Sequence, residues 1–429
     1  MNIFKNKLLW LAPIVAIILF LIFSIAFYPA FNPKPQDIPI AIVNHDKGTD
    51  IQGKNINIGK QLEDKLLNSD KDIVKWIQVD DEDDLKQGMK DQKYFGAAII
   101  EKDFSQHAMS KTQQVAMTAK KQEMEDKVKS GEVPLAQAKQ MQQKMAQAGS
   151  NNTEKPEQAS FKTIVNQGAG TQASQIVSQV LNGMGDNVNQ NITKQSLTTL
   201  EKQNVDVPAK DIQKLTQPVK VDTQQANKVG DHQAGGNGPF LMFMPVWMGS
   251  IVISVLLFFA FRTSNNIAIH HRLIAALGQI AMTIVTALIG AFAYVYFMKE
   301  ALGFDFNDAN MTALFIAFAI MGFVGLILGT MTWLGMKSVP IFFILMFFSM
   351  QLVTLPQQML PEFYQKYIVG WNPFAHYANS LKEILYLDGS IQLDSTMWML
   401  IGFMIFGAVS ALIAAALRKH STKRTEVPS

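Results

Sequence analysis

Six stretches of the chain are apolar over the length that a helix needs to cross a membrane. A helix rises about 1.5 Å per residue, so about 20 apolar residues span a hydrocarbon core of about 30 Å. None of the six contains Asp, Glu, Lys, Arg or His, whereas a core helix of a soluble protein rarely runs so far without a charge. The pattern therefore predicts six spans: Leu8–Tyr28, Phe240–Phe261, Leu273–Met298, Met311–Met336, Val339–Leu355 and Met397–Leu417.

The first of these stretches has two interpretations. Lys5 and Lys7 give it a basic start, and Ser24-Ile25-Ala26 forms a small-x-small site like that of a cleaved signal peptide. Its apolar part exceeds the length of about 7–15 residues that is typical of a signal peptide. This length favours a retained anchor, and cleavage would leave the orientation of the other five spans unchanged.

Lysine and arginine at the span ends predict the orientation of the chain, because cytoplasmic loops of membrane proteins are enriched in both. All four arginines lie in the loop 262–272 or in the tail 418–429, and Lys337 falls on the same side. We therefore expect both chain ends in the cytoplasm, and residues 29–239 and 356–396 outside the plasma membrane of a bacterium.

The polar block between the first two spans predicts an α/β domain with a helical stalk. Short apolar runs bounded by turn residues indicate strands, and amphipathic runs between them indicate helices. A β-α-β-α-β order of this length favours a sheet with at least partly parallel pairing. The expected strands are Ile38–Val43, Ile73–Val79 and Tyr94–Ile100, the expected helices are Ile58–Leu67 and Asp81–Lys90, and Val205–Val221 is a candidate for a returning strand.

From Phe104 onward the composition shifts to Gln, Lys, Ala and Met, with apolar positions at a spacing of three and four. This spacing predicts two long helices that form a hairpin or stalk. The expected organisation is a cytoplasmic start and first span at 1–28, an extracellular domain at 29–239, and a five-span domain with a cytoplasmic tail at 240–429. Within the extracellular domain, the α/β part takes 37–105 and about 203–222, and the stalk takes about 106–201.

Composition and motifs exclude several classes of function. Without any Cys, the chain has no thiol nucleophile, disulfide or thiolate metal site. A net charge of only +3, with no long basic run, argues against nucleic-acid binding. No Gly-x-x-x-x-Gly-Lys-[Ser/Thr] loop, carboxylate pair or Ser/His/Asp spacing indicates an enzyme, and His45-Asp46 is too small a set for a metal site. We expect no catalytic, cofactor-binding or metal site.

The uncharged spans also bear on the source of energy. Proton- and ion-coupled transporters usually place ionisable side chains inside the helix bundle, and the predicted spans have none. If the chain transports a molecule, we expect a separate ATPase subunit to supply the energy.

Four short pieces follow one another after the first span: Ile38–Asn44 with Asp46-Lys47-Gly48, Gly59-Lys60-Gln61-Leu62, Trp76-Ile77-Gln78-Val79, and Gly88 through Tyr94–Ile100 to Asp103-Phe104-Ser105. In this order they resemble the N-terminal module of the YhgE/Pip (phage infection protein) family. The five C-terminal spans resemble the permease core of type-2 ABC exporters, to which that family is related. The best local match there runs from Leu355-Pro356 through Leu360-Pro361 to Asn372-Pro373-Phe374. The resemblance covers nearly the whole chain except about 110–200.

This resemblance implies roles for two groups of residues. In type-2 ABC permeases, the loop that corresponds to 262–272 is a coupling helix that sits in a groove of the ATPase. The candidates for that role are Arg262, Thr263, Ser264, His270, His271 and Arg272. The alternative is that these charges only set the topology, with no partner.

Such permeases also have short re-entrant helices on the outer side before the last span. The resemblance therefore implies an outer gate, with the candidates Pro356, Pro361, Trp371, Asn372 and Pro373. Aromatic side chains with polar tips favour the membrane–water boundary, so an ordinary interfacial loop is the alternative.

Gly325 and Gly329 form a Gly-x-x-x-Gly pattern in the fourth span, and Gly322 extends the small face. Glycines at this spacing let two helix backbones approach closely. Packing within one chain is the favoured interpretation, and the seam of a dimer is the alternative.

Together these patterns predict a polytopic α-helical membrane protein with six spans and a large extracellular α/β domain that carries a long helical hairpin or stalk. The expected function is that of a permease subunit of an ABC-type exporter for an apolar or amphiphilic molecule. Its expected partners are membrane lipid, a separate ATPase and a second subunit in a homo- or heterodimer. The rival hypothesis is a non-transporting envelope protein that acts as a phage receptor or as a secretion or cell-surface scaffold.

Overall fold

The computed structural model describes residues 37–51, 54–69, 73–134, 157–203, 215–230, 232–261 and 268–417, together with a few single residues between these ranges. The predicted first span, the loop 262–267 and the tail 418–429 lie outside the described residues. Those residues divide into two compact units. The sheet unit holds Asp37–Asn166 and Ser174–Ala226, and the helical unit holds Gln167–Ala173 and 227–417.

Five strands form the main sheet of the sheet unit, in the order β4-β1-β5-β6-β7. Strand β1 pairs in parallel with β4 and with the central strand β5, β5 pairs antiparallel with β6, and β6 pairs in parallel with β7. The strands are β1 (Ile38–Asn44), β4 (Val74–Gln78), β5 (Gly96–Ile100), β6 (Ala159–Asn166) and β7 (Val219–Ala226). A two-stranded hairpin, β2 (Thr49–Ile51) and β3 (Lys54–Ile56), follows β1.

Helices cover both faces of this sheet because a parallel connection has to cross over a face. Between β1 and β4 the chain forms α3 (Ile58–Leu67), and between β4 and β5 it forms α4 (Glu82–Lys90), which Asp81 caps. Leu85 and Met89 of α4 pack on the face that carries Ala97 and Ile99. These elements confirm the predicted β-α-β-α-β order with parallel pairing.

The prediction of a purely helical segment at 106–201 is wrong in one respect. Two long helices are present, α5 (Phe104–Lys129) and α7 (Thr171–Lys202), but strand β6 lies between them. In β6 every second side chain from Ala159 is buried, so the strand completes the sheet with an alternating pattern. Helix α7 packs on the sheet face of Gly96, where Val177 and Leu181 leave no room for a side chain at that position.

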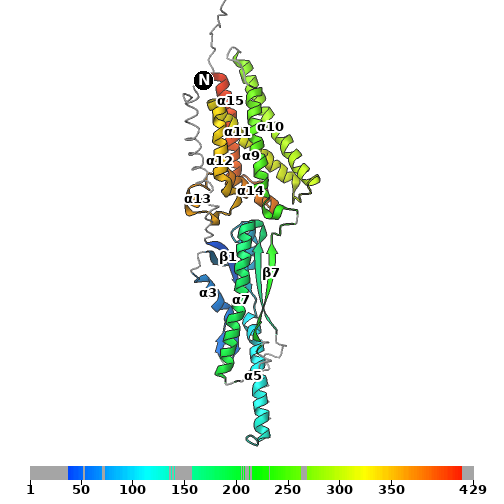
Figure 1. Ribbon diagram of the computed structural model, residues 1–429, viewed down its shortest axis with the longest axis vertical. Coiled ribbons are helices and arrows are strands. Elements are labelled where there is room, and N and C mark those ends of the chain that lie inside the picture. The colour runs from blue at the N-terminus through cyan, green and yellow to red at the C-terminus, as the bar shows by residue number, and fades with distance from the viewer. Residues whose placement is uncertain are drawn as a thin grey trace, which may run out of the picture. The chain divides into compact units, whose positions relative to one another are not determined.

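The helical unit is built around α11, which is buried over most of its length and packs against α9, α10 and α15 (Figure 1). A helix that is packed on all sides is expected to have apolar residues on all its faces, and the sequence of α11 has this pattern. The helices of this unit are α9 (Gly238–Ala260), α10 (Ile269–Glu300), α11 (Ala309–Leu334), α12 (Val339–Thr354), α13 (Glu362–Tyr367), α14 (Pro373–Tyr386) and α15 (Ser395–Leu417).

Four stretches of the described chain are long and apolar enough to cross a membrane: Gly238–Ala260, Ile269–Glu300, Ala309–Thr354 and Ser395–Leu417. The sequence predicted five spans in this region. The difference lies in Ala309–Thr354, which holds both α11 and α12, joined by a short turn at Gly335 (φ +66°). Trp247 contacts Phe323 of α11 and Phe342 of α12, so the chain folds back at this turn. Helix α12 has 16 residues and a length of about 24 Å, which is short of a full hydrocarbon core.

Candidate functional site

Helix α14 begins inside the helical unit rather than at its surface. Asn372, which is fully buried, caps the helix: its Oδ1 accepts hydrogen bonds from the backbone N–H groups of Phe374 (3.0 Å) and Ala375 (3.2 Å). The Asn372 Nδ2 donates to Ser349 Oγ of α12 at 2.6 Å. Pro373 has no N–H to satisfy. Because the cap meets the polar groups that a helix start exposes, this end of α14 can be buried without water.

The other candidates for an outer gate take no part in the cap that Asn372 forms. Pro356 and Pro361, both in an extended backbone conformation, precede the 3₁₀ turn Gln357–Met359 and helix α13. Trp371 is 55% exposed, and its Nε1 donates to the Tyr367 carbonyl at 2.7 Å. Phe363 and Tyr367 are equally exposed. The structure thus separates a buried pair, Asn372 and Pro373, from an exposed aromatic row.

Five aromatic side chains from three helices meet around the start of α14. Phe374 lies 4.8 Å from Phe243 and 4.5 Å from Trp247, both on α9, measured between ring centroids. Phe323 of α11 lies 5.0 Å from Trp247 and 5.8 Å from Tyr377. All five are fully buried. We call this group the aromatic cluster: Phe243, Trp247, Phe323, Phe374 and Tyr377.

Tyr386, at the C-terminal end of α14, forms hydrogen bonds to the backbone at the start of α9 and just before it. The Tyr386 hydroxyl accepts a hydrogen bond from the Gly238 N–H at 3.0 Å and donates to the Gln233 carbonyl at 2.9 Å. Burial raises the pKa of Tyr386 to about 12, so the hydroxyl keeps its proton. A Cβ at Gly238 would lie 2.5 Å from the Tyr386 oxygen, so only glycine fits there. The glycine-rich segment before α9 therefore has a defined, hydrogen-bonded course.

One side chain of α14 binds the turn that precedes α7. Lys382 Nζ donates to the Ala169 carbonyl at 3.2 Å. Lys382 is half-buried, and desolvation lowers its pKa to about 8, although Glu383 beside it acts in the opposite direction. Gly170, with φ +132°, packs close to Pro356. Helix α14 therefore contacts the bundle at its start and the turn Gln167–Ala173 at its end.

The candidates for a docking loop are only partly described. Arg262, Thr263 and Ser264 lie outside the described residues. His270, His271 and Arg272 form the first turn of α10, where both histidines are exposed and Arg272 is 6% exposed.

The first turns of α10 extend past the end of α9. The Gln279 side chain donates to the Leu257 carbonyl and fixes the two helices at the same level. From that level α10 runs back ten residues to Ile269, about 15 Å, whereas α9 continues only three residues to Ala260, about 5 Å. His270 and His271 therefore lie about 10 Å beyond the end of α9.

Gly322, Gly325 and Gly329 lie on the face of α11 that α15 covers. A Cβ at Gly325 would lie 2.6 Å from the Phe403 carbonyl oxygen, and a Cβ at Gly407 would lie 2.5 Å from the Gly325 carbonyl oxygen. The same construction brings Gly322 against Leu400 and Gly329 against Phe406. The small face therefore packs within one chain, backbone against backbone.

In the sheet unit, one carboxylate joins three segments. The Asp46 oxygens accept hydrogen bonds from the backbone N–H groups of Gly59 (3.0 Å), Ser105 (3.0 Å) and Gly48 (3.3 Å), and from the Ser105 hydroxyl. A Cβ at Gly59 would lie 2.6 Å from the Asp46 Cβ. Asp46, Gly59 and Ser105 all belong to the pieces that carry the resemblance above. Their role in the fold is to fix the turn after β1 to the starts of α3 and α5.

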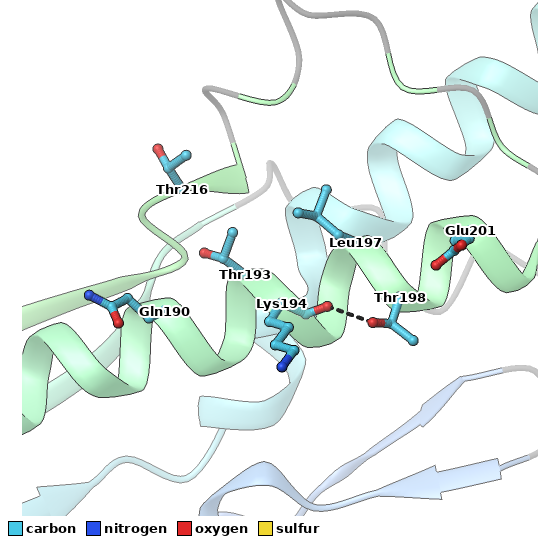
Figure 2. A pocket seen from close by; sticks show the side chains of 7 residues that line it. All are labelled: Gln190, Thr193, Lys194, Leu197, Thr198, Glu201 and Thr216. Carbon is cyan, nitrogen blue, oxygen red and sulfur yellow. Dashed lines mark hydrogen bonds between the residues drawn. The ribbon is translucent and has the colours of Figure 1, made fainter.

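An open hollow of about 580 Å³ lies along α7 (Figure 2). Figure 2 shows that its side chains come mainly from one side of that helix, with a hydrogen bond from the Thr198 hydroxyl to the Lys194 carbonyl (2.9 Å). Among the described residues no group of three or more His, Asp or Glu could hold a metal ion. The residues that line the hollow are Gln190, Thr193, Lys194, Leu197, Thr198, Glu201 and Thr216, and they form no catalytic arrangement.

Sequence reasoning did not single out Trp247, and it placed Tyr377 and Lys382 only in an amphipathic segment at the membrane–water boundary. Trp247 lies four residues after Phe243, and Tyr377 lies three after Phe374, spacings that place each pair on one side of its helix. In a chain with 28 phenylalanines this spacing alone does not distinguish a cluster from ordinary lipid-facing surface.

The family comparison accounts for nearly the whole chain. The family described as ABC-2 family transporter protein matches residues 7–417. The chain belongs to this family. No curated protein and no solved structure matches it.

Membership of the ABC-2 transporter family agrees with the apolar helices of the helical unit and indicates a multi-pass membrane protein. ABC-2 permeases usually work with a separate ATPase subunit. The match begins before the described residues and ends with α15, so the sheet unit falls within it.

Proposed function

We propose that this ABC-2 family protein is the permease subunit of an exporter that moves an apolar or amphiphilic molecule across the bacterial plasma membrane, with energy from a separate ATPase. The observation that carries this proposal is the family match over residues 7–417. Four helices of the helical unit support it, because α9, α11, α12 and α15 contain no Asp, Glu, Lys, Arg or His. An ion gradient therefore finds no group to titrate in these helices.

The proposal includes the finer topology. We place both chain ends in the cytoplasm and the sheet unit outside, with six spans in all, α12 being the fifth. Within the ABC-2 family, the four pieces between Ile38 and Ser105 favour the YhgE/Pip group. The basic residues between 262 and 272 and the exposed histidines of α10 support a cytoplasmic docking site for the ATPase, since these histidines project past α9.

Reconstitution tests the proposal. The chain is placed in vesicles alone, or with the ATPase that co-purifies with it, and the movement of a fluorescent amphiphile is followed. We expect uphill movement only when both proteins and ATP are present. Accumulation driven by a proton gradient in vesicles that hold the lone chain would overturn the proposal.

A docking variant sharpens this experiment. His270→Glu with His271→Glu reverses the charge character of the exposed first turn of α10 and should reduce ATP-driven movement at least tenfold. The control is Ser390→Glu, an exposed position on the other side of the proposed membrane. Equal ATP-driven movement of the amphiphile in both variants would show that α10 does not dock the ATPase.

The rival function, a receptor or scaffold, has one structural observation in its favour. From Met117 to Lys129 no residue of α5 is buried, so this half of the helix has no core to stabilise and offers a surface for a partner. Deletion of 106–200 would also remove β6 and α7, so the test uses substitutions instead. Lys121→Glu with Glu125→Lys should leave ATP-dependent movement intact; if it abolishes every phenotype while the α10 variant has none, the scaffold is the better account.

A further inference from the structure

Two polar atoms of the aromatic cluster are buried without a hydrogen-bond partner among the described residues. They are Trp247 Nε1 and the Tyr377 hydroxyl, and both side chains are 0% exposed. An unpaired buried polar group destabilises the fold, because it loses its hydrogen bonds to water and gains none, and native proteins contain few. Two of them in one cluster therefore require an explanation.

Both atoms belong to side chains that border the same rings. Phe323 of α11 lies 5.0 Å from Trp247 and 5.8 Å from Tyr377. Phe374 contacts Trp247 at 4.5 Å and precedes Tyr377 by one helical turn, and Phe243 contacts Tyr377 at 6.1 Å and precedes Trp247 by one turn. The two side chains therefore lie along one seam, where α14 meets α9 and α11.

The chemistry of the seam defines what it can bind. The indole N–H only donates, and the phenol hydroxyl donates or accepts. None of the rings in the cluster carries a charge, and neither α9 nor α11 contains an ionisable side chain of the Asp, Glu, Lys, Arg or His type. A charged group would stay unpaired there at a high cost, whereas an uncharged oxygen would accept the hydrogen bonds on offer.

We propose that Trp247 and Tyr377 form a binding site for the uncharged oxygen group of an amphiphile, such as the ester or hydroxyl of a glyceride, while Phe243, Phe323 and Phe374 contact its apolar part. This inference rests on the proposed function and narrows its substrate class to neutral, oxygen-bearing amphiphiles. Helix α14 is not among the four candidate spans, yet it supplies Phe374 and Tyr377. The site therefore combines residues of α9 and α11, which are candidate spans, with residues of a helix that is not one.

The test measures binding of tritiated monoolein to the full-length chain in detergent, without ATPase or ATP. Unlabelled monoolein should displace the label, and heptadecene, which has a long apolar chain but no oxygen, should not. Tyr377→Phe and Trp247→Phe each keep a ring in place and should weaken binding about 3- to 10-fold, the effect of losing one hydrogen bond. Tyr367→Phe and Trp398→Phe, at exposed positions, are the matched controls and should bind like the wild type.

Thermal unfolding distinguishes a binding site from two buried polar groups that are simply unpaired or hydrated. If Tyr377→Phe and Trp247→Phe raise the melting temperature and leave monoolein affinity unchanged, the site does not exist. Equal displacement by heptadecene would also overturn it, since the oxygen would then play no part. Because binding is measured without ATP, a failure of ATP-driven transport alongside intact, mutation-sensitive binding rejects the exporter and keeps the site. If ATP-driven transport occurs but monoolein binding is absent or insensitive to the two substitutions, the site is rejected and the exporter is kept.

Discussion

At the scale of single residues, Lys382 is a charged side chain in a partly buried environment. Its ammonium group donates to the Ala169 carbonyl, and its half-burial lowers the pKa to about 8. The unfolded chain would hold the same proton up to a pKa of about 10.4. Between these two values the unfolded state binds more protons than the folded state does, so stability should rise with pH in that window.

Comparison of Lys382→Met with the wild type isolates this contribution. From pH 8 to pH 10 the melting temperature of the wild type should increase relative to that of the variant, because only the wild type gains stability as the folded lysine loses its proton. Intrinsic tryptophan fluorescence during heating measures both proteins. Lys366→Met, at an exposed position of α13, should follow the wild-type pH profile. Parallel curves for Lys382→Met and the wild type would contradict the shifted pKa.

At the scale of elements, the contact of α11 with α15 depends on the absence of side chains. Gly325 and Gly407 bring the two backbones so close that a methyl group at either position meets a carbonyl group of the facing helix. Backbone atoms cannot rotate away as a side chain can, so the helices themselves have to separate. Because α11 is the centre of the helical unit, this separation should loosen the whole bundle.

Two alanine substitutions on α15 test that contact. Gly407→Ala should lower stability by about 1–3 kcal/mol, the usual cost of overpacking. Gly402→Ala is the matched control, because a Cβ at Gly402 meets nothing within 4 Å and alanine favours the helix. The melting temperature of each purified variant should separate them clearly. A tolerated Gly407→Ala would show that the two helices are not in backbone contact.

The sequence predicted the helices and strands that have a clear hydrophobic periodicity. It did not predict the strand whose position depends on pairing with the rest of the sheet. Helix α3 occupies the residues expected for it, because Asn57 caps an amphipathic run. Strand β6 was missed since its alternation, from Ala159 to Val165, is short and lies inside a long polar segment. The candidate site was missed for another reason: the hydrophobic pattern places Trp247 in an apolar span and Tyr377 in an amphipathic segment, but only the structure shows that both are buried and that their polar atoms lack partners among the described residues.

At the scale of the whole molecule, the orientation of α12 in the membrane determines the topology of the chain. The sequence analysis predicts a full span there, whereas the 16 residues of α12 form a helix about 24 Å long. Asn372 and Ser349 join α12 to the buried start of α14, so the end of α12 lies next to that cap. A slightly short helix can still span where the bilayer thins or flanking side chains reach the interface. We therefore expect Lys337 and Glu362, at either end of α12, on opposite sides of the membrane.

The absence of Cys makes this expectation directly measurable, because every introduced thiol is the only one in the chain. Glu362→Cys and Ser390→Cys should react with a membrane-impermeant maleimide on intact cells, whereas Lys337→Cys and His270→Cys should react only after the membrane is permeabilised. All four positions are exposed in the structure, so burial does not limit the reaction. If Lys337 and Glu362 label together, α12 returns to the side on which it began, and the chain with its proposed first span crosses the membrane an odd number of times. The two chain ends would then lie on opposite sides, whereas the side of the α10 start, which precedes α12, would still be decided by the His270→Cys result alone.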